Sequence, residues 1–271
     1  AVEIVVVDDG STDETAEIAR RVDGVRVICQ ANAGLAAARN AGQQAVQSDY
    51  VVFLDHDDRL LPDNLAVNAG HLDAAPVLGF VGGRSVTIDE EGRRLRFVED
   101  ADDPPSCTYE SLLRGTAFVP PSTVMFRRAA LEAIGGADPT MRDGAEDLDV
   151  YLRVARDWPV RRHGRTVVEY RRHGANKSSN ALALLRSSHD LLERQRAFCA
   201  GDARLLEAIA AGKAHWSAIY GPGLVGAGMG HLRRGRFGLG LATLAAALRH
   251  HPAGFPRYAR ARLARSRASR D

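Results

Sequence analysis

The chain has 271 residues and a mass of 29.2 kDa, which is enough for one large domain or two smaller ones with a buried core. Hydrophobic residues make up 45% of the chain and charged residues 26%, so the composition excludes a disordered tail, a fibre and a stapled mini-protein. The apolar stretch at residues 237–248 is shorter than the ~18 residues that span a bilayer. Because no signal peptide precedes the first strand-like run, we expect a cytoplasmic protein.

The charge is unevenly distributed along the chain. The formal net charge is +2, but residues 231–271 carry ten arginines and one acidic residue, which leaves +9 there and −7 elsewhere. Because residues 1–230 carry a net negative charge, this distribution argues against a nucleic-acid-binding role for that part of the chain. Cys29, Cys107 and Cys199 lie far apart and outside any metal-binding spacing, so we expect neither a disulfide framework nor a structural zinc site.

Strand-like and helix-like segments alternate over about the first 90 residues. Residues 4–7 form a β-branched run, and Ser11 with Glu14 has the pattern of a capping box for a helix that reaches about Arg21. Further strands are predicted at residues 25–29, 50–54 and 78–88, and helices at 35–46 and 63–73. This alternation predicts an α/β layered domain with a largely parallel sheet.

The pattern changes in the second half of the chain. Residues 122–126 and 166–170 are strand-like, and helices are predicted at 129–134 and 146–157. From Ala181 onward the strand signals disappear, and the helical pattern is broken at residues 221–230 and at Pro252. We therefore predict an α/β domain over residues 1–180 and a helical, Arg-rich region over residues 181–271.

Acidic side chains follow two of the early strands. Asp8 and Asp9 end the first strand, beside the start of a helix, and Asp55, Asp57 and Asp58 follow the third. Ligands of open α/β sheets bind at the carboxyl ends of strands. The first pair can accept hydrogen bonds from a base or a ribose, or can merely cap the helix. The crowded carboxylates of Asp55, Asp57 and Asp58 would suit Mg²⁺ or Mn²⁺, and the alternative is an acidic turn in contact with solvent.

Four motifs in this order resemble the family 2 glycosyltransferases, which are inverting enzymes. The resemblance covers roughly residues 2–180 and implies a GT-A fold, a Rossmann-like α/β architecture with a mostly parallel sheet and flanking helices. The motifs are Val-Asp-Asp-Gly-Ser-Thr-Asp (7–13), Asn32-Ala-Gly34 with Ala38-Arg39-Asn40-Ala-Gly42, Leu54-Asp55-His56-Asp57-Asp58, and Gly135-Gly136-Ala137-Asp138 followed by Gly144-Ala145-Glu146-Asp147-Leu148-Asp149.

The resemblance implies roles in binding a nucleotide-diphosphate sugar. Asp9, or else Asp8, would hold the nucleoside, with Ser11 beside them, and Asp55 would contact the ribose or the metal. Asp57 would bind a divalent cation, Mn²⁺ or Mg²⁺, that bridges the diphosphate. UDP is the commonest donor nucleotide of the family.

Further roles are implied for the residues around these motifs. Asp147, or Glu146 beside it, would be the general base that deprotonates the acceptor hydroxyl; without the family pattern, the two are charges favoured by the first turn of a helix. Arg39 can reach a phosphate or pair with a surface acid. His173 resembles a histidine near the metal or diphosphate, although a lone histidine is more often structural.

Two features lie outside this match. The family has a further strand ahead of the Asp-Asp-Gly-Ser segment, in the middle of the sheet, and we expect this chain to lack it and to be a fragment of a longer protein. The Arg-rich C-terminus can lie on an anionic membrane, at the inner face of the plasma membrane, or can be a helical cap with an end in solvent.

Three functions are compared. The leading hypothesis is an inverting glycosyltransferase, a hexosyltransferase that acts on a glycan or lipid-linked acceptor in surface glycan or polysaccharide synthesis. The alternatives are a non-catalytic nucleotide-sugar-binding protein, or inactive fragment, and a receiver-type signalling domain. A receiver domain needs a downstream lysine, and the chain contains only Lys177 and Lys213.

Overall fold

The computed structural model describes residues 1–95, 107–115, 118, 120–141, 144–172 and 180–260. The chain divides into two compact units, one made of residues 1–112 and 116–176 and the other of residues 113–115 and 177–271. The first unit contains strands and helices. The described residues of the second unit from 180 onward are predominantly helical.

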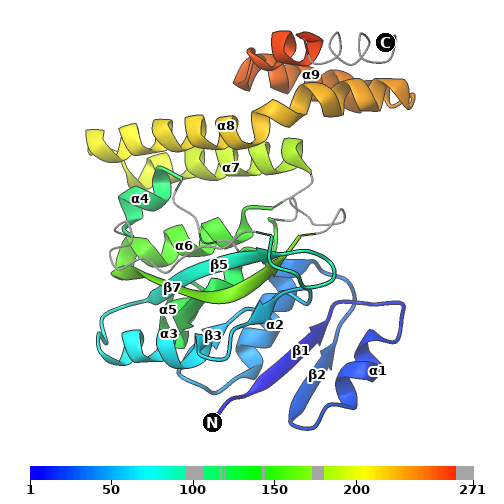
Figure 1. Cartoon of the computed structure of the whole chain (residues 1–271). Helices are drawn as coiled ribbons and strands as arrows, with labels where there is room; N and C mark the ends of the chain where they lie inside the picture. The colour runs from blue at the N-terminus through cyan, green and yellow to red at the C-terminus, as the bar shows by residue number, and fades with distance from the viewer. Residues whose placement is uncertain (96–106, 116–117, 119, 142–143, 173–179, 261–271) are drawn as a thin grey trace. The chain divides into compact units, whose positions relative to one another are not determined.

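The first unit begins with a strand–helix–strand–helix segment. Its elements are β1 (Ile4–Asp8), α1 (Thr15–Arg20), β2 (Val25–Cys29) and α2 (Leu35–Ala45), drawn in blue in Figure 1. β1 and β2 are parallel, in a register that runs from Ile4 opposite Val25 to Asp8 opposite Cys29. This arrangement places the carboxyl end of β1, and the acids that follow it, next to the start of α2.

The helix predicted to begin at a capping box begins later. The backbone N–H of Ser11 donates to Oδ1 of Asp8 at 2.8 Å, so Ser11 closes a turn on the end of β1. Helix α1 starts at Thr15, and its first N–H donates to Asp13 Oδ1 at 3.1 Å, whereas the N-cap residue Glu14 makes no side-chain cap. The capping-box prediction is wrong because the Asp8 carboxylate binds the local backbone first.

The remaining strands form a five-stranded mixed sheet. Its order is β3 (Tyr50–Val52), β6 (Val124–Arg127), β5 (Phe80–Ile88), β7 (Val160–Arg171) and β4 (Arg59–Leu60). β5 and β7 pair in parallel, but β6 is antiparallel to both of its neighbours and β4 is antiparallel to β7. The prediction of a largely parallel sheet is therefore correct only for β1–β2 and β5–β7. Hydrophobic periodicity identifies strands, but it does not reveal that a later strand inserts between two earlier ones.

Helices of the first unit cover this sheet and close its core. They are α3 (Asn64–Asp73), α4 (Tyr109–Leu113), a 3-10 turn at Pro121–Thr123, α5 (Arg128–Ala133) and α6 (Glu146–Asp157). Leu72 of α3 packs with Leu78, Val81 and Met125. The ring of Phe80 lies 5.5 Å, between centroids, from that of Tyr151 on α6. This packing fixes α6, whose bounds agree with the prediction, against the sheet.

The described residues of the second unit contain α7 (Ala181–Gln195), α8 (Ala203–Arg233) and α9 (Phe237–His250), with a 3-10 turn at Arg196–Phe198. Each of these helices packs against the next one in the sequence. The break predicted at Pro252 is confirmed, because α9 ends at His250. Among the described residues, no helix combines the length and the hydropathy that crossing a bilayer requires.

The break predicted at residues 221–230 is wrong, because α8 runs through that segment with Pro222 inside it. Several glycines there are positions of close packing. A Cβ atom on Gly228 would lie 2.8 Å from Leu244 Cγ, and one on Gly221 would lie 2.5 Å from Cβ of His251. These glycines allow the later segments to approach α8, which a side chain would prevent.

Two glycines of α8 give opposite predictions for the same substitution. In Gly212→Ala, the new Cβ would lie 1.9 Å from the carbonyl oxygen of Leu113, so we expect a loss of about 1–3 kcal/mol in the free energy of unfolding. Gly223 has open space around its Cβ position, so Gly223→Ala should gain about 0.5–1 kcal/mol from helix propensity. Urea unfolding of both variants measures these changes, and an equally stable Gly212→Ala variant would contradict this account of α8.

Candidate active site

A buried arginine lies at the centre of the predicted site residues. Arg39 is on α2, and its side chain is 9% exposed. Its Nη2 atom lies 3.1 Å from Oδ1 of Asp55, which follows β3, and its Nη1 atom lies 3.7 Å from Oε1 of Glu146, the first residue of α6. One guanidinium therefore joins three segments that are distant in sequence.

The carboxylates around Arg39 dominate its electrostatics. Burial acts to lower the pKa of the guanidinium, but Asp55, then Asp147 and Glu146, act in the opposite direction, and the pKa is raised. Arg39 is consequently a fixed positive charge. Arg39 also makes a cation–π contact with Phe53, in which its guanidinium carbon lies 5.8 Å from the centroid of the ring.

Asp147 is the acid whose protonation this arrangement changes most clearly. Burial, and then repulsion by Glu146, raises the pKa of its carboxyl from 3.8 to about 6, although Arg39 and the N–H of Leu148 favour the ionised form. The Leu148 N–H donates to Asp147 Oδ1 at 2.8 Å. A carboxyl with this pKa is largely ionised at neutral pH and is close to the optimum for accepting a proton.

The acid pair follows a strained residue. Ala145, the N-cap of α6, has φ +63°, and it is the non-glycine residue with a positive φ in the described part of the chain. A left-handed conformation at alanine costs free energy, and such strain collects at sites where geometry is imposed. At the start of α6, the backbone conformation of Ala145 sets the direction of the helix that carries Glu146 and Asp147.

A small pocket opens beside Arg39 and Asp147. Its wall is mostly apolar, but it also contains Gln43 of α2 and Tyr151 of α6. Within the described residues, neither Oε1 of Gln43 nor the hydroxyl of Tyr151 has a hydrogen-bond partner. Burial, and then the charge of Asp147, raises the pKa of Tyr151 well above its usual value, so the phenol keeps its proton and remains a donor.

The acids that follow β1 form a separate group. Oδ1 of Asp9 accepts hydrogen bonds from Gln30 Nε2 at 2.7 Å and from the Ala33 N–H at 2.8 Å, and Oδ2 accepts from the Gly34 N–H at 2.8 Å. Hydrogen bonds from Ser11 hold the pKa of Asp8 below its usual value. Asp9 thus fixes the loop between β2 and α2.

The acidic turn after β3 is held by a second arginine, Arg171, at the end of β7. Its backbone N–H donates to Oδ1 of Asp58 at 2.9 Å, and its Nε donates to the carbonyl of Asp57 at 3.0 Å. Its Nη1 donates to the carbonyls of Asp89 and Glu90 at 2.9 and 2.6 Å, so one side chain joins two turns. Burial is the main cause that raises the pKa of Asp58 to about 6.

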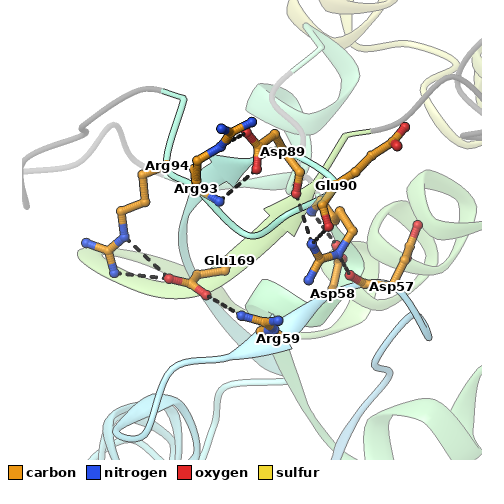
Figure 2. Close-up of polar contacts among 9 residues, drawn as sticks. Asp57, Asp58, Arg59, Asp89, Glu90, Arg93, Arg94 and Glu169 are labelled. Carbon is orange, nitrogen blue, oxygen red and sulfur yellow. Dashed lines mark hydrogen bonds and ion pairs between the residues drawn. The ribbon is translucent and has the colours of Figure 1, made fainter.

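Charged residues on β4, β7 and the Asp89 turn surround this contact. Glu169 accepts from Arg94 Nη2 at 3.2 Å and lies 3.9 Å from Arg59 Nη1 (Figure 2). The Nε atom of Arg93 donates to Oδ2 of Asp89 at 2.7 Å. These pairs hold the Asp89 turn on the sheet, next to the acidic turn that contains Asp57.

Two further contacts position the central acids. Asn40 donates to the carbonyl of Ala137 at 2.8 Å and accepts from its N–H at 2.8 Å, which ties α2 to the segment before α6. Arg153 of α6 bonds to Asp149 at 3.0 Å and to the carbonyls of Ile134 and Gly136. The second and fourth sequence motifs are therefore in direct contact.

The structure brings together Arg39, Asp55, Glu146 and Asp147, while Asp8, Asp9 and Ser11 gather around the end of β1. Arg39 does pair with acids, although it is buried and not on the surface. Asp57 is half-buried on the acidic turn, and His173 lies outside the described residues. The sequence patterns indicated no role for Asn40, Tyr151 or Arg171, and Asp58 was predicted only as one of the crowded carboxylates after the third strand. Tyr151 lies one helical turn after Asp147, a spacing that could have suggested its position.

The chemistry of the donor set fits a divalent cation. Asp57 offers a carboxylate near Asp55, and hard oxygen donors suit Mg²⁺ and Mn²⁺. The described residues contain no cluster of three or more metal-ligating side chains. Mg²⁺ is often held by one or two carboxylates together with the phosphates of a substrate, so a set this small is sufficient.

A sequence-family comparison matches this part of the chain. The model of glycosyl transferase family 2 matches residues 1–135. An uncharacterized glycosyltransferase of Nostoc sp. is 31% identical over 197 residues, which cover 66% of this chain and 58% of that protein. The hyaluronan synthase of Pasteurella multocida is 24% identical over 197 residues, which cover 71% of this chain and 20% of the synthase. The chain thus spans 58% of the length of the first of these relatives and a fifth of the second.

The fold also matches a solved structure. A crystal structure of S. aureus TarS in complex with UDP-GlcNAc superposes with a TM-score of 0.57 at 19% identity, covering 81% of this chain and 61% of that one. The likeness shows a GT-A fold, as predicted.

The raised pKa of Asp147 predicts a specific pH dependence of stability. Between pH 3.8 and about 6 the unfolded chain releases this proton while the folded chain retains it, so the contribution to the free energy of unfolding falls as the pH rises. In Asp147→Asn this decline should be smaller by about 2–3 kcal/mol, since the pKa is raised by about two units and one unit is worth about 1.4 kcal/mol. Urea unfolding at a series of pH values between 4 and about 7 measures the difference.

Asp157→Asn is the control, because Asp157 is exposed at the other end of α6. It should follow the wild-type pH dependence. If Asp147→Asn also followed it, the carboxyl of Asp147 would not hold its proton in the folded chain.

Proposed function

Because the chain belongs to glycosyl transferase family 2, we propose that it transfers a sugar from a nucleotide-diphosphate sugar to a hydroxyl group of a glycan or lipid-linked acceptor, in the synthesis of a surface glycan or polysaccharide. The observation that carries this proposal is the Glu146–Asp147 pair, which adjoins Asp55 through the buried Arg39. A proton acceptor and a donor-binding acid are thereby held on one arginine. Family membership decides against the receiver-domain alternative.

The proposed donor is a UDP-sugar. TarS, which has the same fold, binds UDP-GlcNAc, and the hyaluronan synthase relative makes a polysaccharide by its name. In this proposal Asp9, with Asp8 and Ser11 beside it, holds the nucleoside at the end of β1, and Asp55 contacts the ribose. The loop bonds of Asp9 support this role, because they hold its carboxylate in a fixed place next to the end of the sheet.

Asp57, with Asp55, would hold Mn²⁺ or Mg²⁺ together with the diphosphate, and His173 is proposed as a further ligand. A bound cation offsets the negative charge that grows on the leaving nucleoside diphosphate. The chain's own part is to keep the acidic turn in place. Arg171 does this through the carbonyl of Asp57 and the carboxylate of Asp58, and Arg39 does so through Asp55.

The proposed reaction is a single displacement with inversion. The Asp147 carboxylate, assisted by Glu146, takes the proton of the acceptor hydroxyl while that oxygen attacks the anomeric carbon. The bond from that carbon to the diphosphate oxygen breaks on the opposite face, and its electron pair leaves with the nucleoside diphosphate. Tyr151 and Gln43 line the same pocket as Asp147 and have no partner among the described residues for the hydroxyl and for Oε1, so the Tyr151 hydroxyl can donate a hydrogen bond to an acceptor hydroxyl there and Gln43 Oε1 can accept one.

Calorimetric titration of UDP with and without Mn²⁺ tests the donor site. We expect binding that requires the cation and that weakens about tenfold or more in Asp57→Asn, because one negative ligand is lost. Asp63→Asn is the matched control, since Asp63 lies six residues away and forms a surface ion pair with Arg165. Unchanged affinity in Asp57→Asn would remove Asp57 from the site.

Asp147→Asn separates catalysis from donor binding. It should retain cation-dependent UDP binding and reduce UDP release from a UDP-sugar, with acceptor present, by about 100- to 10,000-fold. Normal turnover in this variant would exclude Asp147 as the base. A wild-type chain that binds UDP-sugars but transfers none to any acceptor would favour the non-catalytic alternative.

A further inference from the structure

We propose that α9 and the turn before it form a docking surface for an anionic lipid bilayer. This inference goes beyond sugar transfer and concerns only the second unit. It depends on two observations that agree: an exposed apolar face on α9, and a chain segment around it that carries positive charge alone.

The apolar face consists of Phe237, Leu241 and Leu248. These side chains belong to residues that are 65%, 62% and 64% exposed. They are four and seven positions apart, which places them within about 40° of one another around the helix axis. Three large hydrophobic side chains on one helix therefore point in nearly the same direction and are covered by nothing in the described residues.

Another face of α9 already has a partner. Gly240, Thr243 and Ala247 are buried, and α8 approaches so closely that a Cβ on Gly240 would lie 2.5 Å from Leu232 Cδ2. The hydroxyl of Thr243 donates to the carbonyl of Leu239 at 2.7 Å, so it presents no free polar group. No residue from 237 to 248 is charged. The exposed side of α9 therefore lacks the polar face that a helix at an ordinary protein surface has.

The stretch of chain that contains this face carries only basic charges. Residues 208–270 contain no aspartate or glutamate and include eleven lysines and arginines. Arg234 and Arg236 are exposed immediately before α9, and Arg249 is exposed in its last turn. The apolar face thus has a positive charge at each end.

A lipid surface fits both properties. The acyl boundary takes up hydrophobic side chains, while the anionic headgroups above it attract arginines, whose long side chains extend to the headgroup level. A second copy of the chain fits less well, because pairing two such faces would bring their arginines together. The charge pattern therefore favours an anionic bilayer over self-association.

Flotation with vesicles tests the proposal. The full chain should bind vesicles of phosphatidylglycerol and phosphatidylcholine, bind pure phosphatidylcholine vesicles at least about tenfold more weakly, and lose affinity as salt rises. Equal binding to both vesicle types, or binding to neither, would overturn the proposal.

A pair of matched variants tests the face itself. Leu241→Glu should reduce partitioning onto the anionic vesicles about tenfold or more, because burial of one leucine is lost and a negative charge is added. Leu239→Glu makes the same change two residues away, at a residue that is 45% exposed and lies outside the face. It should retain more than half of the wild-type partitioning. Equal losses in the two variants would overturn the assignment of the face.

Two further measurements test the role of the arginines and the alternative of self-association. Replacement of Arg234 and Arg236 by glutamine should weaken vesicle binding and reduce its salt dependence. Light scattering without vesicles reports self-association: a wild-type dimer that Leu241→Glu dissociates would overturn the proposal in favour of a second copy. UDP titration of the same variants is independent of vesicle binding, so failure of the donor site and failure of the lipid surface give different results.

Discussion

The candidate site depends on a buried guanidinium that is shared by three carboxylates. Arg39 carries one positive charge, whereas Asp55, Glu146 and Asp147 together carry up to three negative charges. Removing one partner of a buried pair leaves a charge uncompensated and is strongly destabilising, so these side chains constrain one another. A proton on Asp147 reduces the excess negative charge. Burial of this carboxyl and its repulsion by Glu146 therefore raise its pKa. One ion-paired centre thus fixes the position of three segments and prepares a proton acceptor.

The acidic turn after β3 is likewise held by arginine side chains. Arg39 holds its first acid by the carboxylate, and Arg171 holds its last two residues through backbone and side-chain atoms. Because Arg171 also binds the carbonyls of Asp89 and Glu90, the turn and its neighbour are fixed together. The carbonyl of Asp57 accepts the hydrogen bond from Arg171, and the residue is half-buried. Preorganisation of this kind is what a site needs if it is to bind a charged diphosphate without first rearranging.

The elements of this fold were easier to predict from the sequence than their partners. Helix α6 was predicted with its observed bounds because its periodicity and its acidic first turn are both local signals. The insertion of β6 between β3 and β5, and the pairing of Asn40 with Ala137 across 97 residues, are tertiary contacts that no local pattern encodes. Acids and arginines could be proposed as site residues from their chemistry. That Arg39 would be buried and bonded to Asp55 and Glu146 required the three-dimensional arrangement. Local competition also made one prediction wrong, because the Ser11 N–H donates to the Asp8 carboxylate and not to Glu14, as it would in a capping box.

The glycines of the second unit connect packing with surface chemistry. Where α8 and α9 meet, Gly228 and Gly240 leave room for Leu244 and Leu232 of the opposite helix. Other large hydrophobic residues of α9 lie on its exposed side, at Phe237, Leu241 and Leu248. In a protein that needed only a helical cap, selection for solubility would favour polar residues at these positions, because exposed apolar patches promote association. Their presence in a segment without a single acidic residue is explained if the surface meets lipid, and a lipid-linked acceptor would be found at such a surface.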